Sequence, residues 1–169
     1  MADMKLPDPE ALLDTLAAKI RADLRPETAL VGIHTGGVWV AQRLHRMLDV
    51  RLPMGTIDVA FYRDDYKKKG LATGVRPSDI PFPVEDAEII LVDDVLYTGR
   101  TIRAAMNEIF DYGRPTSIRL AALLDRGERQ LPICPQYVGA EVTATRDQTI
   151  ELKRDEAGRL ALALVSRSA

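Results

Sequence analysis

The chain has 169 residues, 46% of them hydrophobic and 28% charged, a composition typical of one soluble globular domain with a substantial core. Its net charge of −2 argues against a protein held to nucleic acid by overall positive charge, but allows a local basic patch. The single cysteine, Cys134, excludes an internal disulfide, and we expect it to be an at least half-buried thiol in a cytoplasmic protein. No apolar stretch approaches the ~18 residues of a membrane span.

The amino-terminal part predicts a helix, a strand and a second helix. Asp8 is a plausible helix cap, and apolar residues from Leu12 to Leu24 repeat on one helical face. The apolar run 29–33 predicts a strand. It breaks into Thr35-Gly36-Gly37, after which the apolar residues of 38–48 again have helical spacing.

The middle of the chain repeats this pattern. The stretch 56–62 is rich in β-forming residues, and the apolar run 88–92 predicts a strand buried on both faces. The polar segment 93–101 follows, then an amphipathic helix over 102–110 and a strand over 117–124. Strands that alternate with helices predict a parallel α/β sheet, in which ligands bind at the carboxyl ends of the strands.

The remainder of the chain predicts a single domain, 1–169, with two special parts. The runs 149–153 and 159–165 predict a hairpin, placed in a small β-rich subdomain over about 125–169. The span 63–85 holds several Lys, Gly and Pro residues without periodicity, so we expect a flexible lid or binding loop.

The segment 93–101 carries the strongest chemical signal. Backbone N–H groups and hydroxyls of 98–101, at a helix start, suit a phosphate group. The carboxylates of Asp93 and Asp94 suit ribose hydroxyls or a hydrated Mg²⁺. An alternative is that the acids only cap the loop and the Thr-Gly turn only starts a helix. Because the sequence has no P-loop or dinucleotide motif, it does not favour a nucleoside triphosphatase or a nicotinamide enzyme.

The run 89–101 resembles the phosphoribosyl-pyrophosphate (PRPP) motif of type I phosphoribosyltransferases. With 62–65 before it and 124–132 after it, the chain is similar more narrowly to bifunctional pyrimidine-operon regulators that are also uracil phosphoribosyltransferases. The resemblance covers about 30–150. It implies an α/β fold with a central, mostly parallel sheet flanked by helices, a small β-rich hood and a flexible lid.

The resemblance also implies roles for individual residues. The catalytic set would be Asp93, Asp94 and Tyr97, where Tyr97 stands in place of a carboxylate that purine-using relatives carry. The remaining positions would bind the 5′-phosphate of PRPP (Val95, Leu96, Thr98, Gly99, Arg100, Thr101), pyrophosphate (Thr35, Gly36, Gly37, and Arg63 of the lid) and uracil (Arg126, Ile150).

The implied reaction transfers ribose 5-phosphate from PRPP to N1 of uracil and yields UMP and pyrophosphate. The implied cofactor is Mg²⁺, carried by PRPP near Asp93 and Asp94, with no metal assigned to direct protein ligands. Related regulators carry Lys and Arg where this chain has His34 and Gly36, which leaves fewer cations for a diphosphate.

Other functions remain open from the sequence. The chain could be a nucleotide-sensing protein that binds pyrimidine-operon leader mRNA with little turnover, or a purine or orotate phosphoribosyltransferase. The candidate cations for an RNA surface are Arg103, Arg114, Arg119, Arg129, Arg146, Lys153 and Arg154. The lid has a second set of cations that could contact PRPP or RNA, namely Arg63, Lys67, Lys68, Lys69 and Arg76. The resemblance implies a homodimer or homotetramer, and Trp39 is expected in the core or at a subunit contact.

Overall fold

A computed structural model describes residues 4–59 and 77–167 of the chain. Its centre is a sheet with strand order β2-β1-β3-β4-β5, in which every neighbouring pair is parallel. The strands are β1 (Thr28–Ile33), β2 (Gly55–Ile57), β3 (Glu88–Leu96), β4 (Ser117–Asp125) and β5 (Tyr137–Glu141). The predicted parallel α/β sheet is therefore confirmed.

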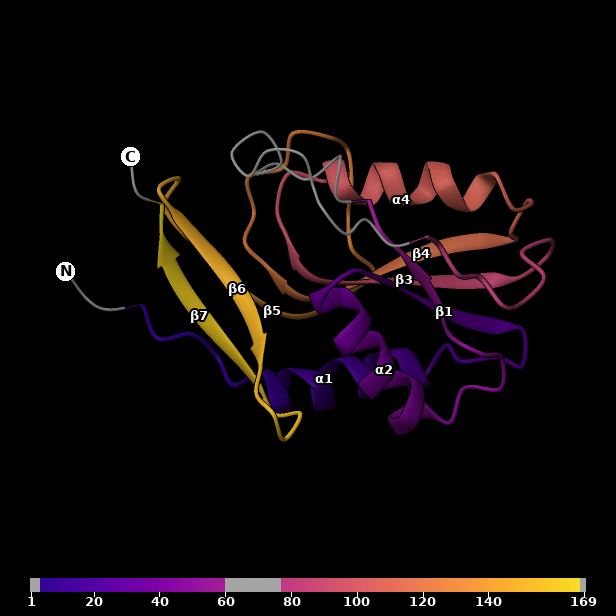
Figure 1. The fold of residues 1–169 in the computed structure, drawn as a ribbon, viewed down its shortest axis with the longest axis horizontal. Helices are drawn as coiled ribbons and strands as arrows, with labels where there is room; N and C mark the ends of the chain where they lie inside the picture. Colours follow the sequence, from indigo (N-terminus) through magenta and orange to yellow (C-terminus); the bar gives the residue numbers. More distant parts are fainter. Residues whose placement is uncertain (1–3, 60–76, 168–169) are drawn as a thin grey trace.

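Helices cover both faces of this sheet (Figure 1). On one face lie α1 (Pro9–Arg21) and α2 (Gly36–Leu48), and on the other lies α4 (Arg100–Phe110). The Asp8 carboxylate accepts the N–H of Glu10 at 3.1 Å, which confirms the predicted cap. The helix ends before Leu24, so the predicted helical face was too long at its carboxyl end.

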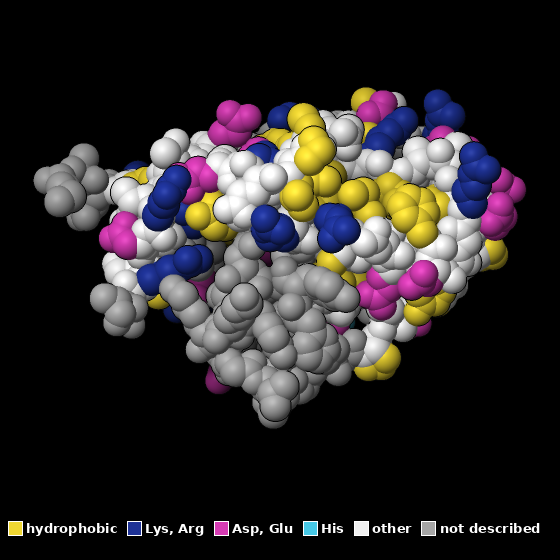
Figure 2. Space-filling model, turned by 90° about the horizontal axis from the view of Figure 1, so that it is seen from above, with side chains coloured by type: hydrophobic (Ala, Val, Ile, Leu, Met, Phe, Trp, Pro, Cys, Tyr) yellow, Lys and Arg dark blue, Asp and Glu magenta, His cyan; other side chains and the backbone are white. Residues whose placement is uncertain are grey.

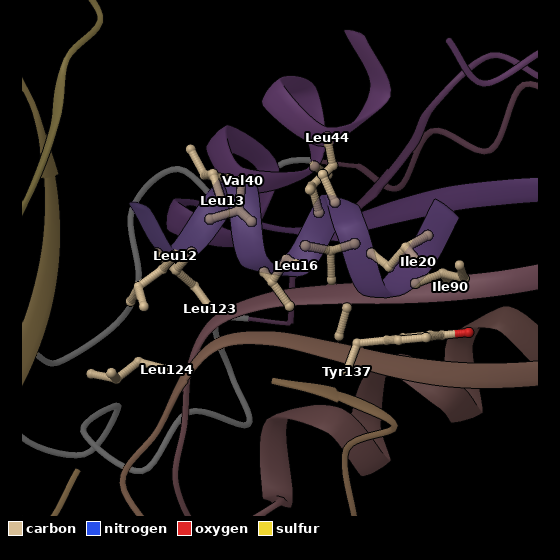
Figure 3. Packing of buried hydrophobic residues seen from close by; sticks show 14 of the residues in the cluster. Leu12, Leu13, Leu16, Ile20, Val40, Leu44, Ile90, Leu123, Leu124 and Tyr137 are labelled. Carbon is tan, nitrogen blue, oxygen red and sulfur yellow. The ribbon is translucent and has the colours of Figure 1, made fainter. Parts of the chain in front are cut away.

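Each face of the sheet has its own apolar cluster. Figure 3 shows Leu16 and Ile20 on the face of α1 that is turned toward the sheet, near Ile90 of β3. On the opposite face, Ile102 and Ile109 of α4 belong to the second buried cluster. The sheet is thus buried on both sides, as long apolar strands require.

Strand β3 is longer than the sequence pattern predicts. We expected it to end at Val92, but it continues to Leu96 and pairs with β4 through Asp93↔Ala122 and Leu96↔Asp125. Hydrogen bonds to the neighbouring strand pair the backbone N–H and C=O groups whatever the polarity of the side chains. The polar residues 93 and 94 therefore did not end the strand. Strand β2, by contrast, ends at Ile57, and positions 60–62 of the predicted strand lie outside the described residues.

The expected lid over 63–85 does not hold for its last part, 77–85. Backbone groups of Asp79 and Thr56 exchange hydrogen bonds of 2.7 and 2.9 Å, and the side chains of Phe82 and Val84 are buried in the second cluster. Burial of these two apolar side chains fixes the segment on the sheet. The lid cations Arg63, Lys67, Lys68, Lys69 and Arg76 lie outside the described residues.

The predicted hairpin is confirmed as β6 (Gln148–Arg154) and β7 (Leu160–Ser166), which form a separate antiparallel sheet. It stands beside one end of the main sheet in Figure 1. The preceding segment holds β5, which the sequence analysis missed and which extends the main sheet. Cys134 is exposed rather than at least half-buried as we expected. Within 4–59 and 77–167, no helix has the length and apolar character of a membrane span.

Candidate functional site

A cleft of about 340 Å³ lies at the carboxyl ends of β1 and β3, between the main sheet and the hairpin. Its lining brings together nine of the predicted site residues: Thr35, Gly36, Asp93, Asp94, Val95, Tyr97, Thr101, Arg126 and Ile150. Five further lining residues were not predicted as site residues: Trp39, Thr149, Glu151, Leu152 and Arg167. The cleft thus lies where ligands bind in parallel α/β sheets.

The carboxylates of Asp93 and Asp94 are held by the main chain next to them. Asp93 Oδ1 accepts the N–H of Asp94 at 2.9 Å, and Asp94 Oδ1 accepts the N–H of Val95 at 2.8 Å. Asp93 is buried, whereas Asp94 is half-buried. These bonds orient both acids at the end of β3, where they can accept hydrogen bonds from a ligand.

The glycine turn, residues 35–37, lies directly against the end of β3. A Cβ added to Gly36 would be 2.1 Å from Asp94 Oδ2, and one added to Gly37 would be 2.6 Å from the carbonyl oxygen of Val92. The peptide bond between His34 and Thr35 is cis. Only glycine allows these approaches, so the turn and the acidic strand end form one wall of the cleft.

The 97–101 loop leads from β3 into α4. The hydroxyl oxygen of Thr98 accepts the N–H of Arg100 at 3.3 Å, and Gly99 has a φ of 93°, which favours glycine. The helix therefore begins with its amide groups at this loop, an arrangement suited to an anion.

Not all predicted phosphate-binding residues line the cleft. Leu96 is buried in the second apolar cluster, so its side chain does not reach a ligand. Thr98 is also buried. The Arg100 side chain is exposed, and its Nε donates to Gln130 Oε1 at 2.9 Å.

Arg126 connects the end of β4 with the hairpin. Its guanidinium carbon lies 4.0 Å from the ring centre of Tyr97. Nη1 donates to the carbonyl oxygen of Gln148 at 2.9 Å, and Nη2 donates to that of Thr145 at 3.1 Å. Its Nε is buried without a hydrogen-bond partner among the described residues. Because unpaired buried donors are costly, this atom is suited to donate to a ligand.

The unpredicted lining residues come from α2, from β6 of the hairpin and from Arg167, which directly follows β7. Trp39 packs against the first apolar cluster, as expected, but it also lines the cleft, and Arg154 stacks on its ring at 4.7 Å. Trp39 lies one turn into the helix that follows the glycine turn, and this position in the sequence could have indicated a site residue. Arg167 donates from Nε to Thr149 Oγ1 at 2.9 Å; nothing in its sequence context indicated a site.

The donor set of the cleft fits a cation carried by a ligand. Among the described residues, no three His, Cys, Asp or Glu side chains converge on one point. Mg²⁺, however, keeps several waters and is commonly bound by one or two carboxylates together with substrate phosphates. Asp93 and Asp94 provide such carboxylates.

The comparisons with known proteins agree with this geometry. Residues 5–149 match the family described as phosphoribosyl transferase domain. A purine phosphoribosyltransferase from Pyrococcus horikoshii is 26% identical with a TM-score of 0.61, covering 79% of this chain and 82% of that one. A hypoxanthine phosphoribosyltransferase from Staphylococcus aureus has 21% identity, a TM-score of 0.66 and coverages of 85% and 80%. The chain therefore belongs to the phosphoribosyltransferase family.

Relatives of higher sequence identity show which kind of phosphoribosyltransferase this chain resembles. The bifunctional protein PyrR of Pseudomonas aeruginosa is 51% identical over 155 residues, 88% of this chain and 90% of the relative. That of Pseudomonas savastanoi pv. phaseolicola is 48% identical over 157 residues, 90% and 92% of the two chains. Within the phosphoribosyltransferases, the relatives of this chain are bifunctional PyrR proteins, which confirms the narrower resemblance of the sequence.

Proposed function

We propose that the protein is a uracil phosphoribosyltransferase, which transfers ribose 5-phosphate from PRPP to uracil and releases pyrophosphate. One observation carries the proposal. The carboxylate of Asp94, the turn at Gly36 and the start of α4 line a single cleft together with Arg126 and Ile150. One wall thus offers groups for a phosphorylated sugar, and the other offers an apolar contact and a hydrogen-bond donor for a base.

The sugar and its phosphates would bind along the main-sheet wall. Asp93 and Asp94 would accept hydrogen bonds from the ribose hydroxyls. The start of α4 and the 97–101 loop would hold the 5′-phosphate, and the glycine turn would hold pyrophosphate through its backbone amides. The proposed contact of Arg63 with the diphosphate lies outside the described residues.

Mg²⁺ fits this wall and would enter with PRPP. Asp93 and Asp94 would hold it, directly or through its waters. When bound, the ion would neutralise charge on the departing pyrophosphate. The residues of the chain then have to orient the sugar and keep the base in line with the breaking bond.

The base would lie on the hairpin wall. Ile150, which is buried in the first apolar cluster, offers one face for the uracil ring, and Arg126 Nε offers a donor for a ring carbonyl oxygen. In the reaction, the bond from C1′ to the pyrophosphate oxygen breaks, the bond from C1′ to N1 of uracil forms, and the proton of N1 is released to the solvent. Positive charge develops on the ribose, so the nearby carboxylates stabilise the transition state.

The test is a Mg²⁺-dependent PRPP assay with uracil, hypoxanthine, guanine and orotate, each followed by release of nucleotide and pyrophosphate. Turnover with uracil alone is the expected result. Preference for hypoxanthine, guanine or orotate would replace the proposed substrate by another base. No turnover with any base, together with measurable UMP binding, would overturn the enzyme assignment in favour of a nucleotide sensor.

A second proposed function is UMP-dependent binding to pyrimidine-operon leader mRNA, which the bifunctional name of the relatives favours. The expected RNA cations are spread over the molecule: Arg103 lies on α4, whereas Lys153 and Arg154 lie on the hairpin. Figure 2 shows Lys and Arg scattered over the face seen from above. Gel-shift titration at low salt, with and without UMP, tests this function, and no shift in either condition would contradict it.

We also propose a homodimer or homotetramer. Phe110, the last residue of α4, and Tyr112 in the turn after it are 57% and 48% exposed, and Figure 2 shows hydrophobic side chains gathered on the face seen from above. Exposed apolar groups of this size favour contact with another chain. Light scattering of the purified protein measures the assembly, and a monomer at all concentrations would contradict it.

A further inference from the structure

Arg129 links separate parts of the chain around the 97–101 loop. Its Nη1 donates to the carbonyl oxygen of Tyr97 at 2.7 Å and its Nε to that of Ile133 at 3.0 Å. Its Nη2 donates to Asp125 Oδ2 at 2.6 Å. The side chain is 22% exposed. Arg129 was one of the expected RNA-binding cations, but its guanidinium is already engaged on all its nitrogen atoms.

The neighbouring residues of Arg129 hold the next peptide of the same loop. The carbonyl oxygen of Thr98 accepts the N–H of Gln130 at 2.9 Å and that of Leu131 at 3.2 Å. A Cβ added to Gly99 would lie 2.9 Å from Ile133 Cγ1. The 97–101 loop is therefore fixed from one side by residues 129–133.

The trans geometry of the peptide bonds determines where the amide N–H groups of the 97–101 loop point. The peptide bonds 97–98 and 98–99 are trans, so each N–H points opposite to the preceding carbonyl. Since the carbonyl oxygens of Tyr97 and Thr98 point toward residues 129–131, the N–H groups of Thr98 and Gly99 point away from them. This is the arrangement that a backbone cradle for a phosphate needs.

We propose that Arg129 is a positioning residue that orients the 97–101 loop for the 5′-phosphate of PRPP and of UMP. Asp125 fixes Arg129 in turn, since its other carboxylate oxygen, Oδ1, accepts the N–H of Gly127 at 2.9 Å. Arg129 acts through the backbone and does not touch the ligand. The inference rests on the proposed phosphoribosyltransferase function.

The test compares Arg129→Gln with Arg103→Gln, the same change at an exposed position of α4. We expect Arg129→Gln to raise KM for PRPP and Kd for UMP by about 100-fold. KM for uracil should stay close to that of the wild type, because the hairpin wall is unchanged. Arg103→Gln should behave as the wild type. If Arg129 had only a structural role, the variant would contain less folded protein, so its apparent kcat would fall while KM for PRPP stayed unchanged.

Arg129→Lys keeps the inference testable if Arg129→Gln does not fold by circular dichroism. A lysine can keep the ion pair with Asp125, but one ammonium does not replace the planar fork that reaches Tyr97 and Ile133. It should therefore also weaken UMP binding. Normal KM for PRPP and normal Kd for UMP in a folded Arg129 variant would overturn the inference. A wild-type protein that binds UMP without turnover would overturn the proposed enzyme, while the UMP titration would still decide the role of Arg129.

Discussion

The carboxylate of Asp94 fills the space beside Gly36 that a side chain at position 36 would need. A Cβ added to Gly36 would lie 2.1 Å from Asp94 Oδ2. The acid stands at the end of β3 and the glycine at the start of α2. Since Asp94 Oδ1 also accepts the N–H of Val95, turning the carboxylate away would break that bond. The position of a proposed catalytic group therefore depends on the absence of a side chain on another element.

Gly36→Ala should lower kcat/KM for PRPP by about 100-fold, because the added methyl group displaces the Asp94 carboxylate. The fold should survive, since the displaced atoms are the end of a side chain. Gly55→Ala is the matched control, because its Cβ would meet its nearest neighbours at 3.3 Å. Steady-state kinetics of both variants make the measurement, and equal activity would contradict the expected displacement.

Asp94→Asn should reduce turnover by at least about 100-fold while leaving thermal stability close to that of the wild type. Asparagine has the same shape and can still accept the N–H of Val95, but it removes the negative charge that would face the ribose and the metal ion. The measurement is initial rate of UMP formation at saturating Mg²⁺. Near-normal turnover would remove the assignment of Asp94 to the ribose site.

Tyr97→Phe should change kcat/KM by no more than about threefold, because a single exposed hydrogen bond contributes little. The hydroxyl donates to Glu128 Oε2 at 3.2 Å, while the ring lies under Arg126. Tyr97→Leu removes the ring and should weaken UMP binding about tenfold through loss of the cation–π contact. Calorimetric titration of both variants with UMP separates the contribution of the Tyr97 ring to binding from that of its hydroxyl. A loss of affinity in Tyr97→Phe as large as that in Tyr97→Leu would show that the hydroxyl is needed.

Arg126→Gln should lower the free energy of unfolding by about 2 kcal/mol, since it removes charged hydrogen bonds to the carbonyl oxygens of Gln148 and Thr145. The hairpin should loosen first, and its amide protons should exchange faster than those of β3. Arg146→Gln, at an exposed position near the hairpin, serves as control. Hydrogen exchange unchanged in β6 would mean that Arg126 does not attach the hairpin.

The ion pair between Glu10 of α1 and Arg43 of α2 should contribute a pH-dependent stability. The hydrogen bond from Arg43 lowers the pKa of the Glu10 carboxyl below its usual value. A lowered pKa in the folded state stabilises the protein above the unfolded-state pKa, and this stability is lost as the pH falls through the folded-state pKa.

Glu10→Gln should therefore cost about 0.5 kcal/mol at pH 7, a value reduced by the partial exposure of the pair, and progressively less as the pH falls through the folded-state pKa of Glu10. Urea unfolding of the variant and the wild type over a series of decreasing pH values makes the comparison. A cost that does not change with pH would assign the effect to packing rather than to charge.

Sequence patterns and structure disagree where a distant contact outweighs a local pattern. The acids at 93 and 94 marked the end of a strand by polarity, yet pairing with β4 carries β3 past them to Leu96. The absence of periodicity over 63–85 predicted a lid that includes 77–85, yet Phe82 and Val84 are buried. Strand β5 is short, and only its pairing with β4 makes it a strand. Such contacts join residues that no local window includes.

The sequence by itself determined the alternation of strands and helices, the cap at Asp8, the hairpin and the residue types suited to a phosphorylated sugar, because each depends on neighbours along the chain. Only the tertiary structure decided that Asp94 lies against Gly36, that Trp39 and Arg167 line the cleft, and that Arg129 is bound to the loop before α4. These relations join side chains from separate elements. They are set by how the sheet, helices and hairpin pack, which no short-range pattern encodes.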